Sequence, residues 1–259
     1  MVIEWPRQAM RRPIVARHAG QVPNTNTHSP ETRSSAARTG TTLWAHIFAA
    51  LYEPFLWAGE HSTLRRLRSQ QLSLAYGRTL EIGGGTGLNL VHYPADLDEL
   101  IVVEPDSAMR ARLRRAATDH NELPVHVLDG AAEQLPFADY SIDTVVSTLV
   151  LCTVDDPARA LQEIARVLRP GGQLIIIEHV RDTRPAAAQR QDRLATPWRH
   201  FARGCRCNQD TEELIVASAL VLDPVQRTSW RGMPGIVRPL IVGRATRAYA
   251  GDASHIDHS

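Results

Sequence analysis

The sequence predicts an α/β fold in which a mostly parallel sheet of seven strands carries helices on both faces and ends in an antiparallel strand. Two patterns support this prediction. From residue 79 onward, short apolar runs alternate with stretches of helical periodicity, which is typical of parallel strands joined by helical crossovers. The last two apolar runs, 220–227 and 239–248, are joined by a Gly- and Pro-rich link without a helix, so we expect them to pair antiparallel.

The individual elements follow from this alternation. Strands are expected at 79–82, 99–104, 125–128, 141–147, 173–180, 220–227 and 239–248, and helices at 62–74, 87–91, 107–118, 156–168 and 211–219. In the segment 166–172, Arg-Val-Leu-Arg-Pro-Gly-Gly, we expect glycine to end one helix and to let the fifth strand start. We therefore assign that segment a structural role and no catalytic one.

The chain has 259 residues, 43% of them hydrophobic, which is enough for one substantial core. Residues 1–40 are rich in Pro, Thr, Ser, Asn and Arg without apolar periodicity, so we expect a disordered tail. We expect a helical extension at 41–76, the α/β domain at 77–250 and a flexible tail at 251–259. Apolar residues recur at helical spacing up to Pro54, which favours a core or lid helix over a helix on a membrane surface.

Composition excludes several classes of function. The net charge is only +1, so the field that attracts nucleic acid is absent, and we interpret the arginine clusters at 65–68 and 110–115 as solvated helix faces. All 29 basic residues are arginine, which excludes lysine chemistry such as a Schiff base. Three cysteines make no disulfide framework in this length, which indicates a reducing cytoplasm. No apolar run approaches the roughly 20 residues of a membrane span.

A glycine-rich turn follows the first expected strand. Residues 80–88 read Leu-Glu-Ile-Gly-Gly-Gly-Thr-Gly-Leu, so Gly83, Gly85 and Gly87 let the backbone bend sharply and approach a ligand closely. The next strand ends in Glu104, a carboxylate that can accept hydrogen bonds from a ribose diol. The dinucleotide fingerprint requires Gly or Ala where Leu88 stands, so the sequence favours S-adenosylmethionine over NAD.

Other candidate residues follow from the position of ligands in such sheets, which is at the carboxyl ends of the strands. This rule selects Asp129, Gly130 and Ala131 after the third strand, Ser147 after the fourth and Glu178-His179 after the fifth. The pair Cys205-x-Cys207 lacks the spacing and the second pair of a structural zinc site, so we expect no metal there.

Four motifs together resemble the class I S-adenosylmethionine-dependent methyltransferases, which have a Rossmann-like fold. They are E-x-G-x-G-x-G at 81–87, V-x-E-P-D at 102–106, L-D-G-x-A-E-x-L-P-F at 128–137 and R-V-L-R-P-G-G at 166–172. The resemblance covers about residues 78–248 and implies cofactor contacts: Gly83, Gly85 and Gly87 with the methionine part, Glu81 with its ammonium group, Glu104 with the ribose hydroxyls, Asp129 with the adenine amino group, Pro105, Gly130 and Ala131 with the ring, and Ser147 at the same edge. As an alternative, Glu104 or Asp129 caps a following helix or turn.

Finer matches resemble one branch of that class. The stretches 89–94, 147–154, 178–180 and 198–211 are similar to the microsomal alkyl thiol S-methyltransferases of animals and to bacterial ubiquinone- or phospholipid-type methyltransferases. The animal enzymes carry an N-terminal hydrophobic anchor where this chain has a polar tail, so only weak contact with a membrane surface is carried over. We expect a small thiol as acceptor. The alternatives are a quinone or phenol, a phospholipid head group, or a cofactor-binding protein without catalysis.

The chemistry of methyl transfer favours a thiol. Presenting a thiolate at neutral pH costs on the order of 2 kcal/mol, against about 4 for a phenolate, so one modest base is enough. His179 is the expected proton acceptor, with a backbone-bonded histidine as the alternative. A group of cysteine and tryptophan side chains is expected either to line the acceptor pocket or to pack in the core. The members of this group are Cys152, Cys205, Trp44, Trp57 and Trp198.

Overall fold

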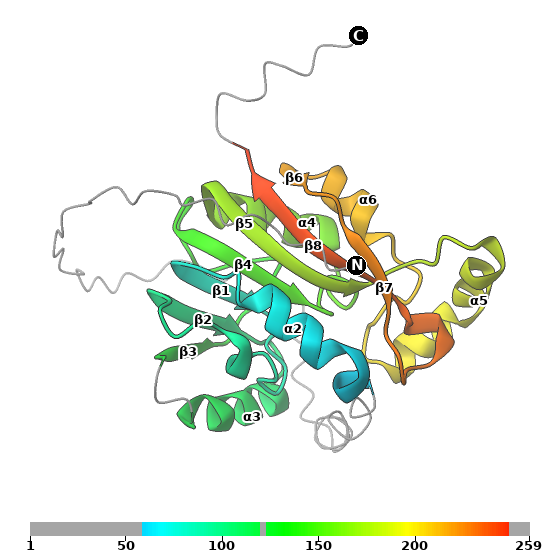
Figure 1. Ribbon diagram of the computed structural model, residues 1–259, viewed down its shortest axis with the longest axis horizontal. Coiled ribbons are helices and arrows are strands. Elements are labelled where there is room, and N and C mark those ends of the chain that lie inside the picture. The colour runs from blue at the N-terminus through cyan, green and yellow to red at the C-terminus, as the bar shows by residue number, and fades with distance from the viewer. Residues whose placement is uncertain (1–58, 120–122, 249–259) are drawn as a thin grey trace, which may run out of the picture. The chain divides into compact units, whose positions relative to one another are not determined.

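A computed structural model describes residues 59–119 and 123–248 of the chain (Figure 1). Along the chain the elements are η1 (Glu60–Leu64), α2 (Arg65–Leu72), β1 (Arg78–Ile82), η2 (Leu90–His92), β2 (Glu99–Val103), α3 (Ser107–Thr118), β3 (Val125–Leu128), β4 (Ile142–Thr148), α4 (Pro157–Val167), β5 (Leu168–His179), α5 (Pro185–Phe201), α6 (Thr211–Val216), β6 (Leu220–Leu222), β7 (Gln226–Ser229), η3 (Gly235–Val237) and β8 (Pro239–Arg247).

The strands form one sheet in the order β3-β2-β1-β4-β5-β8-β6, with β7 also paired to β8. The first five strands pair in parallel, and β8 runs antiparallel to β5, β6 and β7. This confirms the fold class and the antiparallel last strand. The sheet has eight strands rather than seven, because the expected strand 220–227 divides into β6 and β7 around Pro224, which has no N–H to donate.

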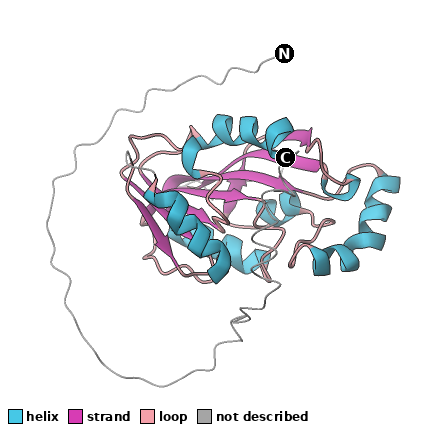
Figure 2. Cartoon of the chain, turned by 90° about the horizontal axis from the view of Figure 1, so that it is seen from below, coloured by secondary structure: helices cyan, strands magenta, loops and turns pink. Residues whose placement is uncertain are grey.

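Helices cover both faces of the sheet (Figure 2). On one face, α4 and α6 bury Leu161, Ile164 and Ile215 in a core cluster with apolar residues of β1, β4 and β5. On the other face, α2 and α3 bury Leu67 and Leu113 in a second cluster. Neighbouring residues of one strand serve opposite clusters because side chains alternate along a strand. The apolar runs of the sequence therefore predict strands that are buried on both faces.

Three regions differ from the sequence prediction. The expected helix 87–91 is reduced to η2, because Gly87 has a φ of +93°, which is outside the helical region. The helix α4 ends at Val167, before the two glycines, and Gly171 instead lies in the irregular start of β5 with a φ of +77°. The helix α5 was not predicted at all.

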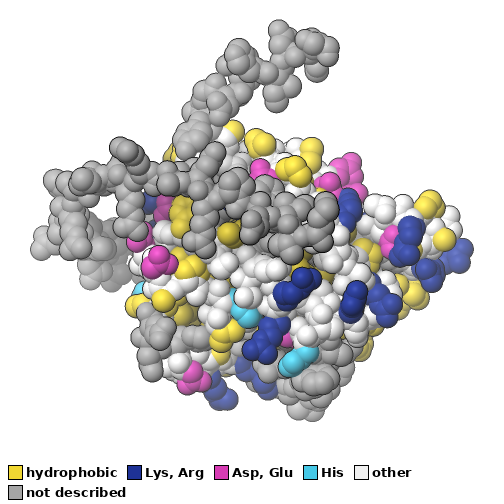
Figure 3. Space-filling model, viewed as in Figure 1, with side chains coloured by type: hydrophobic (Ala, Val, Ile, Leu, Met, Phe, Trp, Pro, Cys, Tyr) yellow, Lys and Arg dark blue, Asp and Glu magenta, His cyan; other side chains and the backbone are white. Residues whose placement is uncertain are grey.

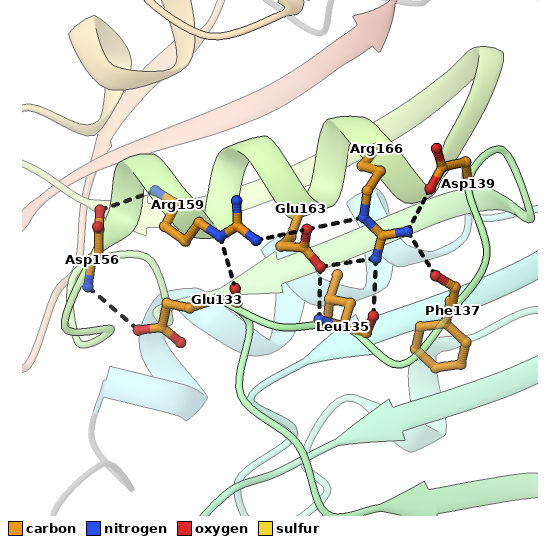
Figure 4. Close-up of polar contacts among 8 residues, drawn as sticks. All are labelled: Glu133, Leu135, Phe137, Asp139, Asp156, Arg159, Glu163 and Arg166. Carbon is orange, nitrogen blue, oxygen red and sulfur yellow. Dashed lines mark hydrogen bonds and ion pairs between the residues drawn. The ribbon is translucent and has the colours of Figure 1, made fainter. Parts of the chain in front are cut away.

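In the R-V-L-R-P-G-G segment, the expectation that glycine ends the helix and starts the strand was wrong, because α4 ends at Val167 and β5 begins at Leu168. Arg166 uses its guanidinium to join α4 to the preceding loop, donating to Glu163, to Asp139 and to the carbonyl oxygens of Leu135 and Phe137 at 2.7–3.0 Å (Figure 4). Every N–H group of this side chain that faces the loop has an acceptor. The network fixes the loop after β3 against α4.

Some predictions lie outside the described residues. These are the tails at 1–40 and 251–259, the first half of the extension at 41–76, and the side chains of Trp44 and Trp57. Among the helices that the structure describes, none has the length and apolar character needed to cross a bilayer.

Candidate active site

The glycine-rich loop after β1 lines a narrow cavity. Gly83 and Gly85 have φ values of +59° and +56°, in the left-handed region that favours glycine. A Cβ at Gly83 would meet Val150 at 2.7 Å, whereas one at Gly85 would meet no atom within 4 Å in the described part of the chain beyond its own neighbours. The backbone at Gly85 therefore faces open space. The cavity is also lined by Arg68, Glu81, Gly84, Thr86, Leu88, Asn89 and Thr148.

Glu104 lies at the end of β2 and reaches toward this loop. Its carboxylate accepts hydrogen bonds from the N–H groups of Gly85 and Asp106, both at 2.8 Å. Burial raises the pKa of Glu104 to about 7, although both hydrogen bonds oppose the shift. The cap of α3 is Asp106, whose side chain accepts from Ala108 and Met109. Since Asp106 performs that function, the capping alternative for Glu104 is not needed.

Glu81 is buried between side chains that the sequence did not indicate as functional. Its two oxygens accept from Asn89 at 2.8 Å and from Tyr93 at 2.9 Å, and burial raises its pKa. Arg68 donates to Asn89 and forms an ion pair with Glu60 at 3.2 Å. Arg68 is only 5% exposed, so the interpretation of the whole cluster 65–68 as a solvated face was wrong. The sequence alone does not distinguish the buried Arg68 from the exposed Arg65 and Arg66, because all three are arginines in the same helical stretch.

The predicted adenine contacts follow β2 and β3. Asp129 forms a bidentate ion pair with Arg110 at 2.9 and 3.1 Å, and its side chain is 70% exposed. Arg110 also donates to the carbonyl oxygens of Glu104 and Pro105. The next residues, Gly130 and Ala131, continue along the same edge, where Ala131 forms an isolated bridge with Gln134. Arg110 thus connects the segments that carry Glu104 and Asp129.

The loop after β4 is held by a buried acid on β5. One oxygen of Glu178 accepts from the hydroxyl of Ser147 at 2.6 Å and from the N–H groups of Val150 and Leu151 at 3.0 and 3.1 Å. The turn passes through Leu149 with a φ of +59°, an uncommon conformation for leucine that often occurs at functional sites. The strand-end rule selected Glu178 as a candidate without a role, and its hydrogen bonds show that it shapes this loop.

The same loop brings Cys152 to His179 and Cys205. His179 Nε2 and Cys205 Sγ are 2.8 Å apart, and Trp198 Nε1 donates to that sulfur at 3.1 Å. The ligand-type atoms of Cys152, His179 and Cys205 all lie within 4.8 Å of one another, and all three residues are buried. Four of the residues predicted as catalytic or substrate-binding therefore meet, although they come from four segments of the chain. We call these residues, Cys152, His179, Trp198 and Cys205, the sulfur–imidazole group.

Electrostatics within this group separate the cysteines. Hydrogen bonding from Cys152, together with the charge and hydrogen bonds of His179 and Trp198, lowers the pKa of Cys205 to about 4 against the effect of burial. Burial raises the pKa of Cys152 well above its usual range. Burial lowers the pKa of His179, but the charge and hydrogen bond of Cys205 outweigh that effect, so the net shift is upward. These shifts favour a thiolate at Cys205 and make the imidazole of His179 a stronger proton acceptor.

The loop 147–152 connects the glycine-lined cavity with the sulfur–imidazole group. Thr148 lines the cavity, and the side chain of Val150 packs against Gly83. Cys152 follows two residues later and belongs to the group. The segment 147–152 thus places the sulfur–imidazole group, which can exchange protons, close to a ligand bound at the glycine loop.

A larger cavity of about 910 Å³ lies between α5 and the β7–β8 connection. Arginine side chains gather on the part of the molecule that α5 forms (Figure 3). Those that line this cavity mostly have acidic partners: Arg181 pairs with Asp192, Arg184 with Asp182 and Arg227 with Glu212. Because this cavity contains neither the glycine loop nor a nucleophile, we place the candidate active site at the narrower one.

A parallel sheet with this strand order, a glycine loop after β1 and an acid after β2 define a class I methyltransferase architecture. Residues 80–176 match a family model described as a methyltransferase domain. Thiol S-methyltransferase TMT1B of Mus musculus is 34% identical over 173 residues, which are 65% of this chain and 70% of that relative. The chain therefore belongs to the S-adenosylmethionine-dependent methyltransferases.

Other relatives differ in acceptor and in coverage. Thiol S-methyltransferase TMT1A of Homo sapiens is 31% identical over 65% of this chain and 70% of the relative. A phosphatidylethanolamine N-methyltransferase of Cereibacter sphaeroides is 34% identical over 54% of this chain and 68% of the relative. For TMT1B of Rattus norvegicus the match spans only 55% of the relative's length. Family membership thus leaves the acceptor to be argued from the site.

Solved structures show the same fold. A methyltransferase of Thermotoga maritima, described as a possible histamine N-methyltransferase, has a TM-score of 0.56 at 26% identity, covering 78% of this chain and 99% of that one. The [4+2]-cyclase SpnF has a TM-score of 0.61 at 18% identity, covering 79% of this chain and 95% of that one. Since a cyclase shares the fold, the architecture alone does not specify the reaction.

Proposed function

We propose that this chain transfers a methyl group from S-adenosylmethionine to a small-molecule thiol. The observation that carries the proposal is the sulfur–imidazole group, which supplies one modest base and includes Cys152 on the loop next to the glycine loop. Relatives at 31–35% identity described as thiol S-methyltransferases support the same acceptor.

Polar atoms around the glycine-lined cavity support a cofactor with hydroxyl groups. A Cβ at Gly85 would occupy space that no other described residue fills, and the buried hydroxyl of Thr86 has no hydrogen-bond partner among the same residues. Each oxygen of Glu104 accepts one backbone N–H and keeps lone-pair capacity for ribose hydroxyls. A ligand with hydroxyl groups would therefore satisfy polar atoms that the protein leaves with spare capacity.

We assign the cofactor contacts as follows. Gly83, Gly85 and Gly87 would face the methionine part, with Glu81 near its ammonium and Arg68 near its carboxylate; Glu104 would bind the ribose, and Pro105, Asp129, Gly130 and Ala131 would surround the adenine. Ser147 acts indirectly, because its hydroxyl is bonded to Glu178. Arg68 is the addition that the structure suggests, since it lines the cavity as a buried cation.

On the acceptor side, the protein aligns the thiol and removes its proton. When bound, S-adenosylmethionine supplies a methyl group on a positively charged sulfur, and that carbon–sulfur bond breaks as the electron pair of the acceptor forms the new one. We propose that His179 accepts the thiol proton and that Cys152, Cys205 and Trp198 form the surrounding wall. The cost of ionising a thiol is on the order of 2 kcal/mol, which one histidine can offset.

An acceptor panel with methyl-labelled cofactor tests the proposal. We expect turnover of a small alkyl thiol and none of a phenol, a quinone or vesicles that contain phosphatidylethanolamine. The lipid arm is included because one relative is a phosphatidylethanolamine N-methyltransferase. Turnover of lipid or phenol without thiol would reject S-methylation, and cofactor binding by calorimetry without any turnover would indicate a non-catalytic role.

We also propose a reducing cytoplasm as the working environment. Cys152, Cys205 and Cys207 are all free and buried. Cytosolic conditions keep such thiols reduced, which the sulfur–imidazole group requires for its hydrogen bonds.

A further inference from the structure

We propose that Cys205 is a thiolate that orients His179 and stabilises its protonated form, so that the two side chains act as one proton-accepting unit. The inference rests on the proposed thiol acceptor for its catalytic part. His179 is the catalytic residue in this arrangement, and Cys205 is a positioning residue that acts through it.

The hydrogen bonds show how the sulfur is used. The indole N–H of Trp198 can only donate, so Cys205 Sγ is an acceptor in the 3.1 Å contact. His179 Nε2 lies 2.8 Å from the same sulfur, so two ring nitrogens converge on one buried sulfur. A neutral thiol would donate its proton to Nε2, whereas the thiolate that we propose accepts from both rings. A sulfur that accepts from an indole and an imidazole in a buried place is stabilised most when it is negatively charged.

The imidazole is thereby fixed in one tautomer. With Nε2–H donating to Cys205, the proton of neutral His179 is on Nε2 and the lone pair is on Nδ1. That nitrogen is buried and has no hydrogen-bond partner among the described residues. A buried polar atom without a partner is rare in folded proteins and is expected where a ligand or substrate completes the bonding.

The neighbouring charged groups support the same charge state. The groups that face His179 are Cys152, Cys205 and the adjacent Glu178, of which Cys205 has the largest favourable effect on the imidazolium. Cys207, two residues beyond Cys205, has a pKa raised by burial to about 11. One thiolate and two thiols are therefore expected at neutral pH.

The proton transfer balances without any further reactant. The thiol proton of the acceptor passes to Nδ1 of His179, which becomes an imidazolium, and the electron pair left on the acceptor sulfur attacks the methyl carbon. Cys205 remains a thiolate and pairs with the new positive charge. An anion that holds a histidine in one tautomer and stabilises its protonated form is a general device in acid–base catalysis. The imidazolium then releases its proton to solvent.

The charge state is measured first, without any acceptor. Thiolate absorbance near 240 nm is titrated from pH 8 downward on the full chain, with circular dichroism at each step to confirm folding. We expect one thiolate at neutral pH in the wild type and in Cys207→Ser, and none in Cys205→Ser. Trp198→Phe keeps an aromatic ring but removes the donor, so its thiolate should protonate about one pH unit higher.

The role in turnover is measured next. Cys205→Ala should reduce kcat/KM for the thiol about 100-fold with little change in cofactor affinity, and Cys205→Asp, which restores a negative charge, should recover at least tenfold. The acid limb of the pH profile should move to lower pH in Cys205→Ser, because His179 loses its anionic partner.

Several outcomes would overturn the inference. They are no thiolate at neutral pH, a pH profile that Cys205→Ser leaves in place, and equimolar bound metal that disappears with Cys205→Ser, since a metal would then occupy the sulfur and imidazole. If no thiol is turned over, the proposed acceptor fails, whereas the titration still decides the charge of Cys205.

Discussion

Two polar networks in this molecule differ in how completely their buried atoms are hydrogen-bonded. The network around Arg166 and Glu163 joins α4 to the loop after β3, and both carboxylate oxygens of Glu163 accept from Arg166 (Figure 4). At the sulfur–imidazole group, His179 Nδ1 has no partner among the described residues, and the same holds for Glu178 Oε2 beside it. Both networks are rich in charge, so charge alone does not separate them.

The difference indicates which network is structural. Arg166 matches its donors to protein acceptors, and its ion pair lowers the pKa of Glu163, as expected of a group that stabilises the fold. The buried atoms near His179 have no partner among residues 59–119 and 123–248. Unsatisfied buried polar atoms with shifted pKa values are typical of functional sites.

The largest effect should come from His179→Ala. We expect turnover of a thiol to fall about 10²- to 10⁴-fold, because the proton acceptor is lost, while the Kd of the cofactor changes less than about twofold. Steady-state kinetics and calorimetry measure the two quantities. Turnover equal to the wild type would remove His179 from the mechanism.

Arg166→Met should do the reverse. It removes the two shortest ion-pair contacts of Glu163, whose side chain is 6% exposed, so the free energy of unfolding should fall by about 2–4 kcal/mol with kcat unchanged. Chemical denaturation measures the loss. Arg159→Met is the matched control, because Arg159 is 52% exposed and contacts Glu163 at 3.4 Å, and it should cost less than about 1 kcal/mol. A large fall in kcat for Arg166→Met would contradict the structural role.

The same ion pair predicts a pH dependence of stability. The pKa of Glu163 is lowered in the folded protein, so its contribution is complete above the unfolded carboxyl value and is lost as the pH falls through the folded one. Denaturation midpoints between pH 6 and pH 3 should therefore fall less in Glu163→Gln than in the wild type. Parallel curves for the two proteins would contradict the assignment.

Cofactor affinity should depend on pH through Glu104. Its pKa of about 7 in the free protein means that the ionised form, which accepts from ribose hydroxyls, grows as the pH rises. Binding should be about tenfold weaker at pH 6 than at pH 8, with no further gain at higher pH. Calorimetry with the demethylated cofactor measures this, and a Glu104→Gln variant should bind weakly at every pH. An equal slope in that variant would assign the dependence to another group.

The smallest effect is expected from Asp129→Ala. Removing one exposed hydrogen-bond acceptor should weaken cofactor binding about three- to tenfold. Asp139→Ala is the control, because Asp139 is another exposed aspartate in an ion pair with an arginine. If both variants bind the cofactor like the wild type, the adenine contact of Asp129 is wrong.

The cofactor half of the fold could be predicted because its signals are local. The strands that flank the glycine turn are short apolar runs, and α3 and α4 begin after Asp106 and Asp156, whose side chains cap them. The candidate residues Glu81, Gly85 and Glu104 follow from the same short segments. The cavity that Glu81 and Gly85 line could not be predicted in full, because Arg68 enters it from α2.

The acceptor half depends on tertiary contacts that have no local signal. The helix α5 contains Pro197, which disfavours helix in a sequence. It is anchored by Gln191, which donates to the carbonyl oxygens of Val180, Cys207 and Ile236. The meeting of His179 with Cys205 depends on the path of the chain between β5 and α6. The sequence indicated His179 and Cys205 as candidates from their residue types, but only the fold shows that their side chains are in contact.

The origin of the sulfur–imidazole group has a consequence for how such enzymes diversify. Trp198 and Cys205 belong to the excursion between β5 and α6, whereas Gly85 and Glu104 belong to the segments after β1 and β2. Exchange of the segment between β5 and α6 among relatives would change which methyl acceptor the site accepts. The residues that contact the cofactor would stay the same. Acceptor specificity can then evolve in this one segment without a loss of affinity for S-adenosylmethionine.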